Sequence, residues 1–161
     1  SSLELADLEK DLTQQIDEIL PPRWSRSNPI DIAGGETRET IPQMIDLILS
    51  HSSVDALIFL GLGIQGNVAR LYSESKYFDS GMERIMNFHN SQEQKYATAL
   101  IDGSKEWGKP VLVASELAAS DPNNAGIEAL RDRQWFCHMS GSRAVASLEN
   151  LCAYARHIET G

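Results

Sequence analysis

Apolar residues along this chain follow two different patterns, which alternate. Spacings of three and four predict six amphipathic helices. The first covers residues 4–20, the second runs from a cap at Thr37 to about His51, and the third begins after Asn67. The fourth covers residues 82–107, a short fifth helix ends near Asp132, and the last runs from 142 to about His157. Between them, short apolar segments at residues 28–32, 54–60, 111–114 and 135–138 predict strands. The polar residues 72–81 fit neither pattern and are predicted to be a surface insertion.

The order of these elements predicts the fold class. Strands that alternate with helices imply a mainly parallel sheet covered on both faces. The segment 54–60, which is apolar except for Asp55, is typical of such a doubly covered strand. We therefore predict an α/β fold, a three-layer flavodoxin-like domain with a sheet of about four strands, in which all 161 residues form a single domain.

Composition narrows the possible partners and location. With 42% hydrophobic and 23% charged residues, the chain can bury a core, and its net charge of −9 argues against binding to nucleic acid or to an anionic membrane. No apolar run reaches the roughly 18 residues of a membrane span, and we predict no signal peptide. Two cysteines are too few for a disulfide framework, so we expect a cytoplasmic protein. Because it lacks an initiator Met, we expect a fragment of a longer chain.

Two glycine-bearing loops follow predicted strands and lead into helices. They contain Gly34-Gly35 and the segment Gly61–Asn67. In parallel α/β sheets ligands bind outside the carboxyl ends of the strands, and the free amides of a helix start can hold an anion. The sequence therefore indicates a phosphate or other anion site here, with a tight packing turn as the structural alternative.

A third interpretation of the second loop is a dinucleotide site. Gly61-Leu62-Gly63-Ile64-Gln65-Gly66 matches the letters G-x-G-x-x-G between a strand and a helix. The fingerprint also requires an acidic residue at the end of the next strand, about 20 residues later. Here that strand ends near Ala114, about 50 residues on, with Glu116 just beyond it. The dinucleotide interpretation therefore stays an alternative only.

Several segments, in their order, resemble a known family. Leu5-Ala6-Asp7-Leu8, Leu20-Pro21-Pro22-Arg23-Trp24-Ser25 and Asn28-Pro29-Ile30-Asp31-Ile32 look like the entry to the ligase-CoA domain of NDP-forming acetyl-CoA synthetases. Residues 54–58, 109–113 and 143–145 also follow the family pattern, so the resemblance covers nearly the whole chain except roughly 72–107. The end of the β subunit of succinyl-CoA synthetase is similar.

The resemblance implies roles for individual residues. Asn28 takes the place of a substrate-contacting Asn, Gly63, Ile64 and Gln65 take the place of a helix start that faces a phosphohistidine, and Glu116 matches a Glu after the third strand. Leu62 departs from the succinate-specific loop, which has Gly there. With the loop residues, the predicted phosphate- or substrate-binding set is Asn28, Gly34, Gly35, Gly61, Gly63, Ile64, Gln65, Gly66, Asn67 and Glu116.

The implied chemistry is a phosphoryl relay from acyl phosphate through a histidine to a nucleoside diphosphate. The parent enzyme would use CoA, ATP or ADP, phosphate, Mg and a small organic acid. The resemblance places the histidine on another domain, so we predict CoA-binding and histidine-bearing partner domains. We predict no catalytic residue, cofactor or metal site in this domain, and no turnover by it alone. A non-catalytic acyl-CoA- or nucleotide-binding regulatory module is the main alternative.

The histidines of this chain are not predicted to take part in the chemistry. We expect structural or surface roles for His51, His89, His157 and the pair Cys137-His138.

Overall fold

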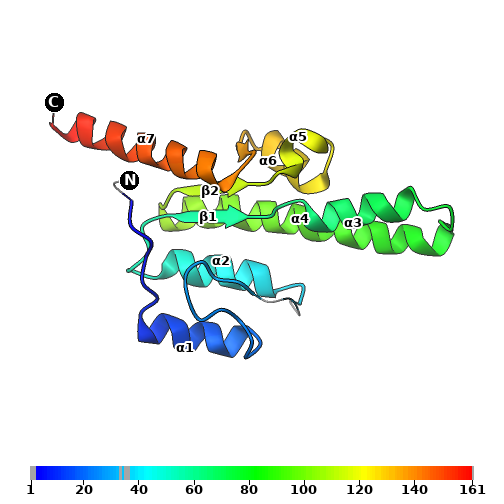
Figure 1. The fold of residues 1–161 in the computed structure, drawn as a ribbon, viewed down its shortest axis with the longest axis horizontal. Helices are drawn as coiled ribbons and strands as arrows, with labels where there is room; N and C mark the ends of the chain where they lie inside the picture. Colours follow the sequence, from blue (N-terminus) through cyan, green and yellow to red (C-terminus); the bar gives the residue numbers. More distant parts are fainter. Residues whose placement is uncertain (1–2, 33, 35–36, 161) are drawn as a thin grey trace.

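A computed structural model describes residues 3–32, 34 and 37–160 of the chain (Figure 1). In chain order, its helices and strands are α1 (Lys10–Ile19), α2 (Thr40–Ser50), β1 (Leu57–Leu60), α3 (Ile64–Ser73), α4 (Ser80–Trp107), β2 (Val111–Ala114), α5 (Leu117–Ser120), α6 (Ala125–Asp132), β3 (Cys137–His138) and α7 (Gly141–Thr160). The alternation of strands with helices confirms the predicted α/β class.

The sheet is parallel and small. Its strand order is β1-β2-β3, with Leu57 opposite Val111 and Val113 opposite Cys137. Because side chains alternate along a strand, β2 serves two apolar layers. Val111 and Val113 pack with α2, α4 and α6, whereas Leu112 packs with α7 on the other face. Helices therefore cover both faces of the sheet.

Three strands are present in the described part of the chain, where about four were predicted. The missing one is residues 28–32, which bond locally instead of joining the sheet. The Ser25 hydroxyl accepts the amide of Asp31 at 2.9 Å, and the amide of Ser25 donates to the carbonyl of Asp31 at 3.2 Å. Ile30 packs against the cluster beside α1. The apolar pattern of this segment thus reflects burial beside a helix rather than strand pairing.

Most other helices and strands are shorter than predicted. α1 begins at Lys10, and α2 begins at Thr40, three residues after the predicted cap. β3 keeps only two residues, because the amide of Trp135 donates to Leu130 at the end of α6. In contrast, α4 runs unbroken for 28 residues from a side-chain cap by Asp79. Residues 71–74 and 76–79, around the turn between α3 and α4, are exposed, although Leu71, Tyr77 and Phe78 are among them. The predicted insertion at 72–81 is partly helical, because α3 runs to Ser73 and α4 begins at Ser80.

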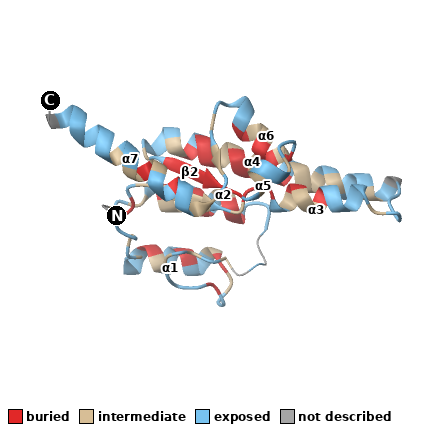
Figure 2. Ribbon diagram, turned by 45° about the horizontal axis from the view of Figure 1, so that its top comes forward, coloured by how far each residue is buried: buried red, intermediate tan, exposed pale blue. Residues whose placement is uncertain are grey.

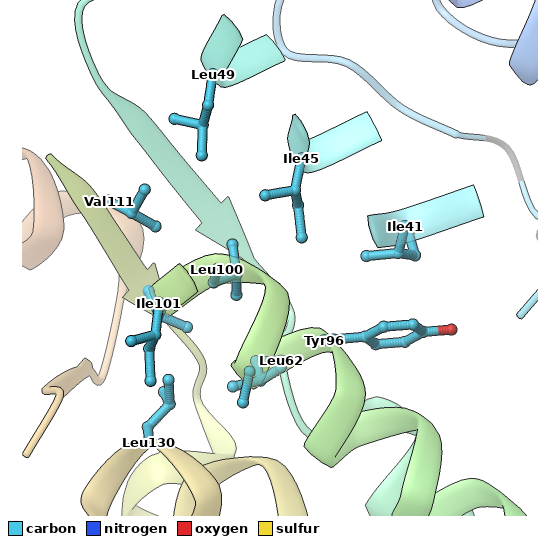
Figure 3. Close-up of a cluster of buried hydrophobic side chains, with 11 residues drawn as sticks. Ile41, Ile45, Leu49, Leu62, Tyr96, Leu100, Ile101, Val111 and Leu130 are labelled. Atoms are coloured by element: carbon cyan, nitrogen blue, oxygen red, sulfur yellow. The ribbon is translucent and has the colours of Figure 1, made fainter. Parts of the chain in front are cut away.

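The largest apolar cluster lies between α2, α4, α6 and one face of the sheet (Figure 3). Its fully buried members include Leu49, Leu100 and Leu130. A second cluster joins α1 to α2 through Leu12 and Ile16, and a third lies between the sheet and α7. Burial is concentrated around the sheet and α4, whereas the last turns of α7 are exposed (Figure 2). Among the described helices, none combines the length and apolar character needed to cross a bilayer.

Candidate anion-binding site at the start of α3

The loop after β1 is fixed by the sheet and by two glycines. The amide of Gly61 donates to the carbonyl of Ala114 at 3.0 Å, which continues the pairing of β1 with β2. Gly61 and Gly63 have φ of +87° and +102°, in the left-handed region that favours glycine. Gly63 is the N-cap residue of α3, so the sequence places the helix start at the carboxyl end of β1, as predicted.

A carboxylate of the protein already binds this helix start. Glu93 on α4 is 1% exposed. Its Oε2 accepts the amide of Gly63 at 2.8 Å, and its Oε1 accepts the amide of Gln65 at 2.6 Å. The free amides and the dipole at a helix start favour a negative charge. Two of the backbone amides that were predicted to bind a phosphate therefore donate hydrogen bonds to Glu93.

Asn124 fastens the same loop from the other side. This residue is buried, its Nδ2 donates to the carbonyl of Gly63 at 2.8 Å, and its Oδ1 accepts the amide of Gly126 at 3.1 Å. The first bond holds the α3 loop, and the second caps α6. A Cβ on Gly66 would lie 2.6 Å from Nδ2 of Asn124, so glycine is required for this close approach. Helices α3, α4 and α6 thus meet through polar contacts at this point.

The environment of Glu93 sets its charge. Burial raises the pKa of Glu93 above the ordinary 4.5, and the amides of Gly63, Gln65 and Gly66 partly offset this effect. Among the described residues, no basic side chain forms an ion pair with Glu93. Its carboxylate is therefore stabilised by hydrogen bonds from backbone amides. The site is a protein-made anion receptor occupied by the chain's own carboxylate.

The raised pKa predicts a pH dependence of stability. Between the ordinary value of 4.5 and the folded-state pKa, the native protein binds more protons at Glu93 than the unfolded chain does. We expect the stability advantage of the wild type over Glu93→Gln to be largest below about pH 4.5 and to shrink as the pH rises through the folded-state pKa. Urea unfolding of both proteins over a pH series measures this difference. An advantage that grows with pH would contradict the assignment.

The outer side of the loop is more open. Ile64, the first residue of α3, is 58% exposed, and Leu60 is 59% exposed. The side chain of Gln65 contacts Nδ1 of His89 at 2.6 Å through its Oε1, and His89 stacks on Tyr72. His89 was predicted to be a surface residue and is half-buried against the loop instead.

The other predicted site residues are dispersed. Nδ2 of Asn28 donates to the carbonyl of Ala6 at 3.0 Å, and exposed Gly34 accepts Arg23 through its carbonyl at 3.0 Å. Neither has a hydrogen bond to Gly61–Asn67 among the described residues. Gly35 lies outside the described residues.

The last two predicted residues lie in the Gly61–Asn67 loop and beside it. Asn67 is in the first turn of α3, where its Oδ1 accepts Arg70 at 2.9 Å. Glu116 is exposed and precedes α5, just after the carboxyl end of β2. The structure therefore groups the Gly61–Asn67 loop with the end of β2, whereas Asn28 and Gly34 have contacts elsewhere.

Sequence reasoning missed the two side chains that define the site. Glu93 lies on the same helix as the buried residues Ala97 and Leu100, at spacings of four and seven. A charged residue in phase with an apolar face was the available signal. Asn124 is the N-cap residue of α6, and an Asn just before a helical segment is a local signal for that role. Its second bond, to Gly63, spans 61 residues and had no local signal.

Comparison with protein-family models, with curated proteins and with solved structures gave no match. The class of protein is therefore defined by fold and site alone. The chain is a mixed α/β domain with a small parallel sheet. At the carboxyl end of β1, a glycine loop is closed by a buried carboxylate.

Proposed function

We propose that this chain is a flavodoxin-like domain of a cytoplasmic NDP-forming acid–CoA ligase, in which the start of α3 faces the phosphate of a phosphohistidine relay. The observation that carries the proposal is that the Gly63–Gln65 backbone is formed as an anion receptor. It binds a carboxylate through amides at 2.8 and 2.6 Å, at the carboxyl end of a parallel strand. Ligands of open α/β sheets bind outside the carboxyl ends of the strands, although the described order β1-β2-β3 contains no reversal of strand order.

In the proposed relay, acyl-CoA and inorganic phosphate give acyl phosphate and free CoA. The acyl phosphate then transfers its phosphoryl group to a histidine of another domain and releases the acid, and the phosphohistidine passes that group to a nucleoside diphosphate. This chain supplies no reacting group. Its contribution is electrostatic, because the positive end of the α3 dipole stabilises the phosphate.

Glu93 decides how the phosphate can approach. Because its carboxylate holds the amides of Gly63 and Gln65 from the buried side, the relay phosphate would meet α3 from the outer side, where Ile64 is exposed. Glu93 then shapes the loop, and the helix dipole acts on the phosphate. Helix dipoles stabilise nearby anions by about 0.3–1 kcal/mol at a surface, so a second helix start from a partner domain is needed as well.

A second candidate function is a non-catalytic regulatory module that binds an acyl-CoA or a nucleotide. The specific observation in its favour is again Glu93, because an internal carboxylate that neutralises the helix start leaves less attraction for a transferred phosphate. A complete polypeptide that binds acyl-CoA but forms no phosphohistidine would favour this candidate over the ligase.

The experiment compares Ile64→Asp with Ile64→Asn in the complete ligase, with its CoA-binding and histidine-bearing domains present. Asp at the start of a helix is well tolerated, so the fold is retained, but its charge repels an approaching phosphate. We expect phosphohistidine formation from radiolabelled phosphate and acyl-CoA to fall at least about tenfold in Ile64→Asp relative to Ile64→Asn, a change of about 1.4 kcal/mol.

Equal rates for the two variants would remove the start of α3 from the relay. Gly63→Asp is a poorer test, because a Cβ at Gly63 would lie 3.2 Å from both Asn124 and Leu117 in a backbone of φ +102°. Loss of activity in that variant would report a damaged fold. Ile64 is more than half exposed, so its substitution separates charge from packing.

A further inference from the structure

The first turn of α1 meets the end of α2 in a cluster of three potential metal ligands. Glu9 is the N-cap residue of α1, Asp11 lies in its first turn, and His51 follows α2. One ligand atom from each of the three residues lies within 4.8 Å of the other two, and Oδ2 of Asp11 is 3.2 Å from Nε2 of His51. The cluster lies at the α1–α2 junction and has no part in the α3 site.

We propose that Glu9, Asp11 and His51 bind a divalent transition-metal ion of the Zn²⁺ type. Zinc binds His nitrogen and carboxylate oxygen at about 2.0–2.2 Å in tetrahedral geometry, which places neighbouring ligand atoms about 3.3–3.5 Å apart. The separation of 3.2 Å between Asp11 and His51 is close to such an edge. The remaining distances, up to 4.8 Å, close by rotation of the exposed Glu9 side chain.

The imidazole is held in place through its other nitrogen. The His51 side chain is 10% exposed, and its Nδ1 lies 2.7 Å from the hydroxyl of Ser53 and accepts the amide of Ser53 at 3.3 Å, while Nε2 faces Asp11. A metal on Nε2 moves the proton to Nδ1, which then donates to the Ser53 hydroxyl instead of accepting the amide, and this kind of outer contact fixes ligating histidines. The carbonyl of His51 also accepts Nζ of Lys109 at 2.6 Å, which anchors the residue to the loop before β2.

The donor set selects the kind of metal. Imidazole nitrogen favours Zn²⁺, Co²⁺ or Ni²⁺, whereas Mg²⁺ and Ca²⁺ prefer oxygen ligands. Two carboxylates and a neutral imidazole compensate the charge of a divalent ion. The carboxylate of Glu9 makes no capping bond to the backbone of α1, so it is available to the ion. A fourth position remains for water, because three protein residues supply ligands.

The test is calorimetric titration of the chain with ZnCl₂, in a buffer that does not chelate zinc. Wild type should bind one ion, and Asp11→Asn and His51→Gln should each weaken that binding at least tenfold. His157→Gln is the matched control, since it removes an exposed histidine from α7, and should bind like the wild type. Asp11 has a side chain that is 67% exposed, so Asp11→Asn tests the site without disturbing the core.

A second measurement identifies the ligands directly. Co²⁺ in place of Zn²⁺ should give visible absorption of a tetrahedral oxygen- and nitrogen-ligated ion, without the strong near-ultraviolet band of a thiolate ligand. Circular dichroism of each variant shows that it is folded. Failure of the folded wild type to bind zinc at 100-fold molar excess would overturn the proposal. Binding that Asp11→Asn and His51→Gln leave unchanged, such as binding at Cys137 or Cys152, would also overturn it.

Discussion

Glu93→Ala is expected to lower the free energy of unfolding by roughly 3–5 kcal/mol near neutral pH. The substitution leaves the amides of Gly63 and Gln65 without their acceptor, and an unsatisfied buried donor costs about 1–3 kcal/mol. It also leaves a cavity where a side chain only 1% exposed had been. Urea unfolding followed by circular dichroism measures the loss.

The matched control is Glu106→Ala, the same change on an exposed residue of α4. It should alter the free energy of unfolding by less than about 0.5 kcal/mol, as is usual for surface substitutions. Glu93→Gln should fall between the two, because its amide keeps one acceptor oxygen but places a second donor beside the backbone N–H groups. Equal losses in Glu93→Ala and Glu106→Ala would show that the carboxylate does not hold the loop.

Gly66→Ala is expected to lower the free energy of unfolding, although helix propensity alone would predict that it raises it. In a free helix, Ala is about 1 kcal/mol more favourable than Gly. Here the new Cβ would lie 2.6 Å from Nδ2 of Asn124, which is buried and bonded to both Gly63 and Gly126. Because Asn124 cannot move without losing those bonds, we expect a loss of about 1–3 kcal/mol in urea unfolding.

A double-mutant cycle isolates the cause. In an Asn124→Ala background the steric conflict is removed, so Gly66→Ala should be neutral or stabilising there. Gly141→Ala, at the start of α7, serves as the matched glycine control, because its new Cβ would make only an ordinary contact of 3.4 Å with the exposed Leu60 side chain, and it should change stability by less than about 0.5 kcal/mol. If Gly66→Ala were as harmless as Gly141→Ala in the wild-type background, the close approach of α3 to Asn124 would be wrong.

Local patterns predicted the parts of this fold that depend on local chemistry. The 28-residue helix α4 and the buried strand β2 follow from periodicity, and the glycines of the β1–α3 loop follow from the backbone they require. The first predicted strand was wrong, because its residues Ile30 and Ile32 are partly buried against the α1–α2 cluster and do not pair with the sheet. Periodicity reports that a face is buried but does not identify the surface that covers it.

The candidate site shows the same limit more sharply. The loop after β1 was located from its glycines. The group that accepts its amides, however, is the carboxylate of Glu93, which lies 30 residues beyond Gly63. Asn124 is 61 residues away. Such contacts are fixed by the packing of α3 and α6 on α4, and no local spacing encodes them. The resemblance placed Asn28 at the site, whereas the structure bonds it to Ala6.

The attachment of α1 has a consequence for the dynamics of the chain. This helix packs through a cluster of its own with α2, separate from the central cluster around α4. A local opening can therefore release α1 while Leu100, Ile101 and Leu130 stay buried. Amide protons of α1 should then exchange with solvent through this sub-global opening, at a lower free energy than those in the buried part of α4. We therefore expect hydrogen exchange to distinguish two cooperative units of unequal stability within one chain.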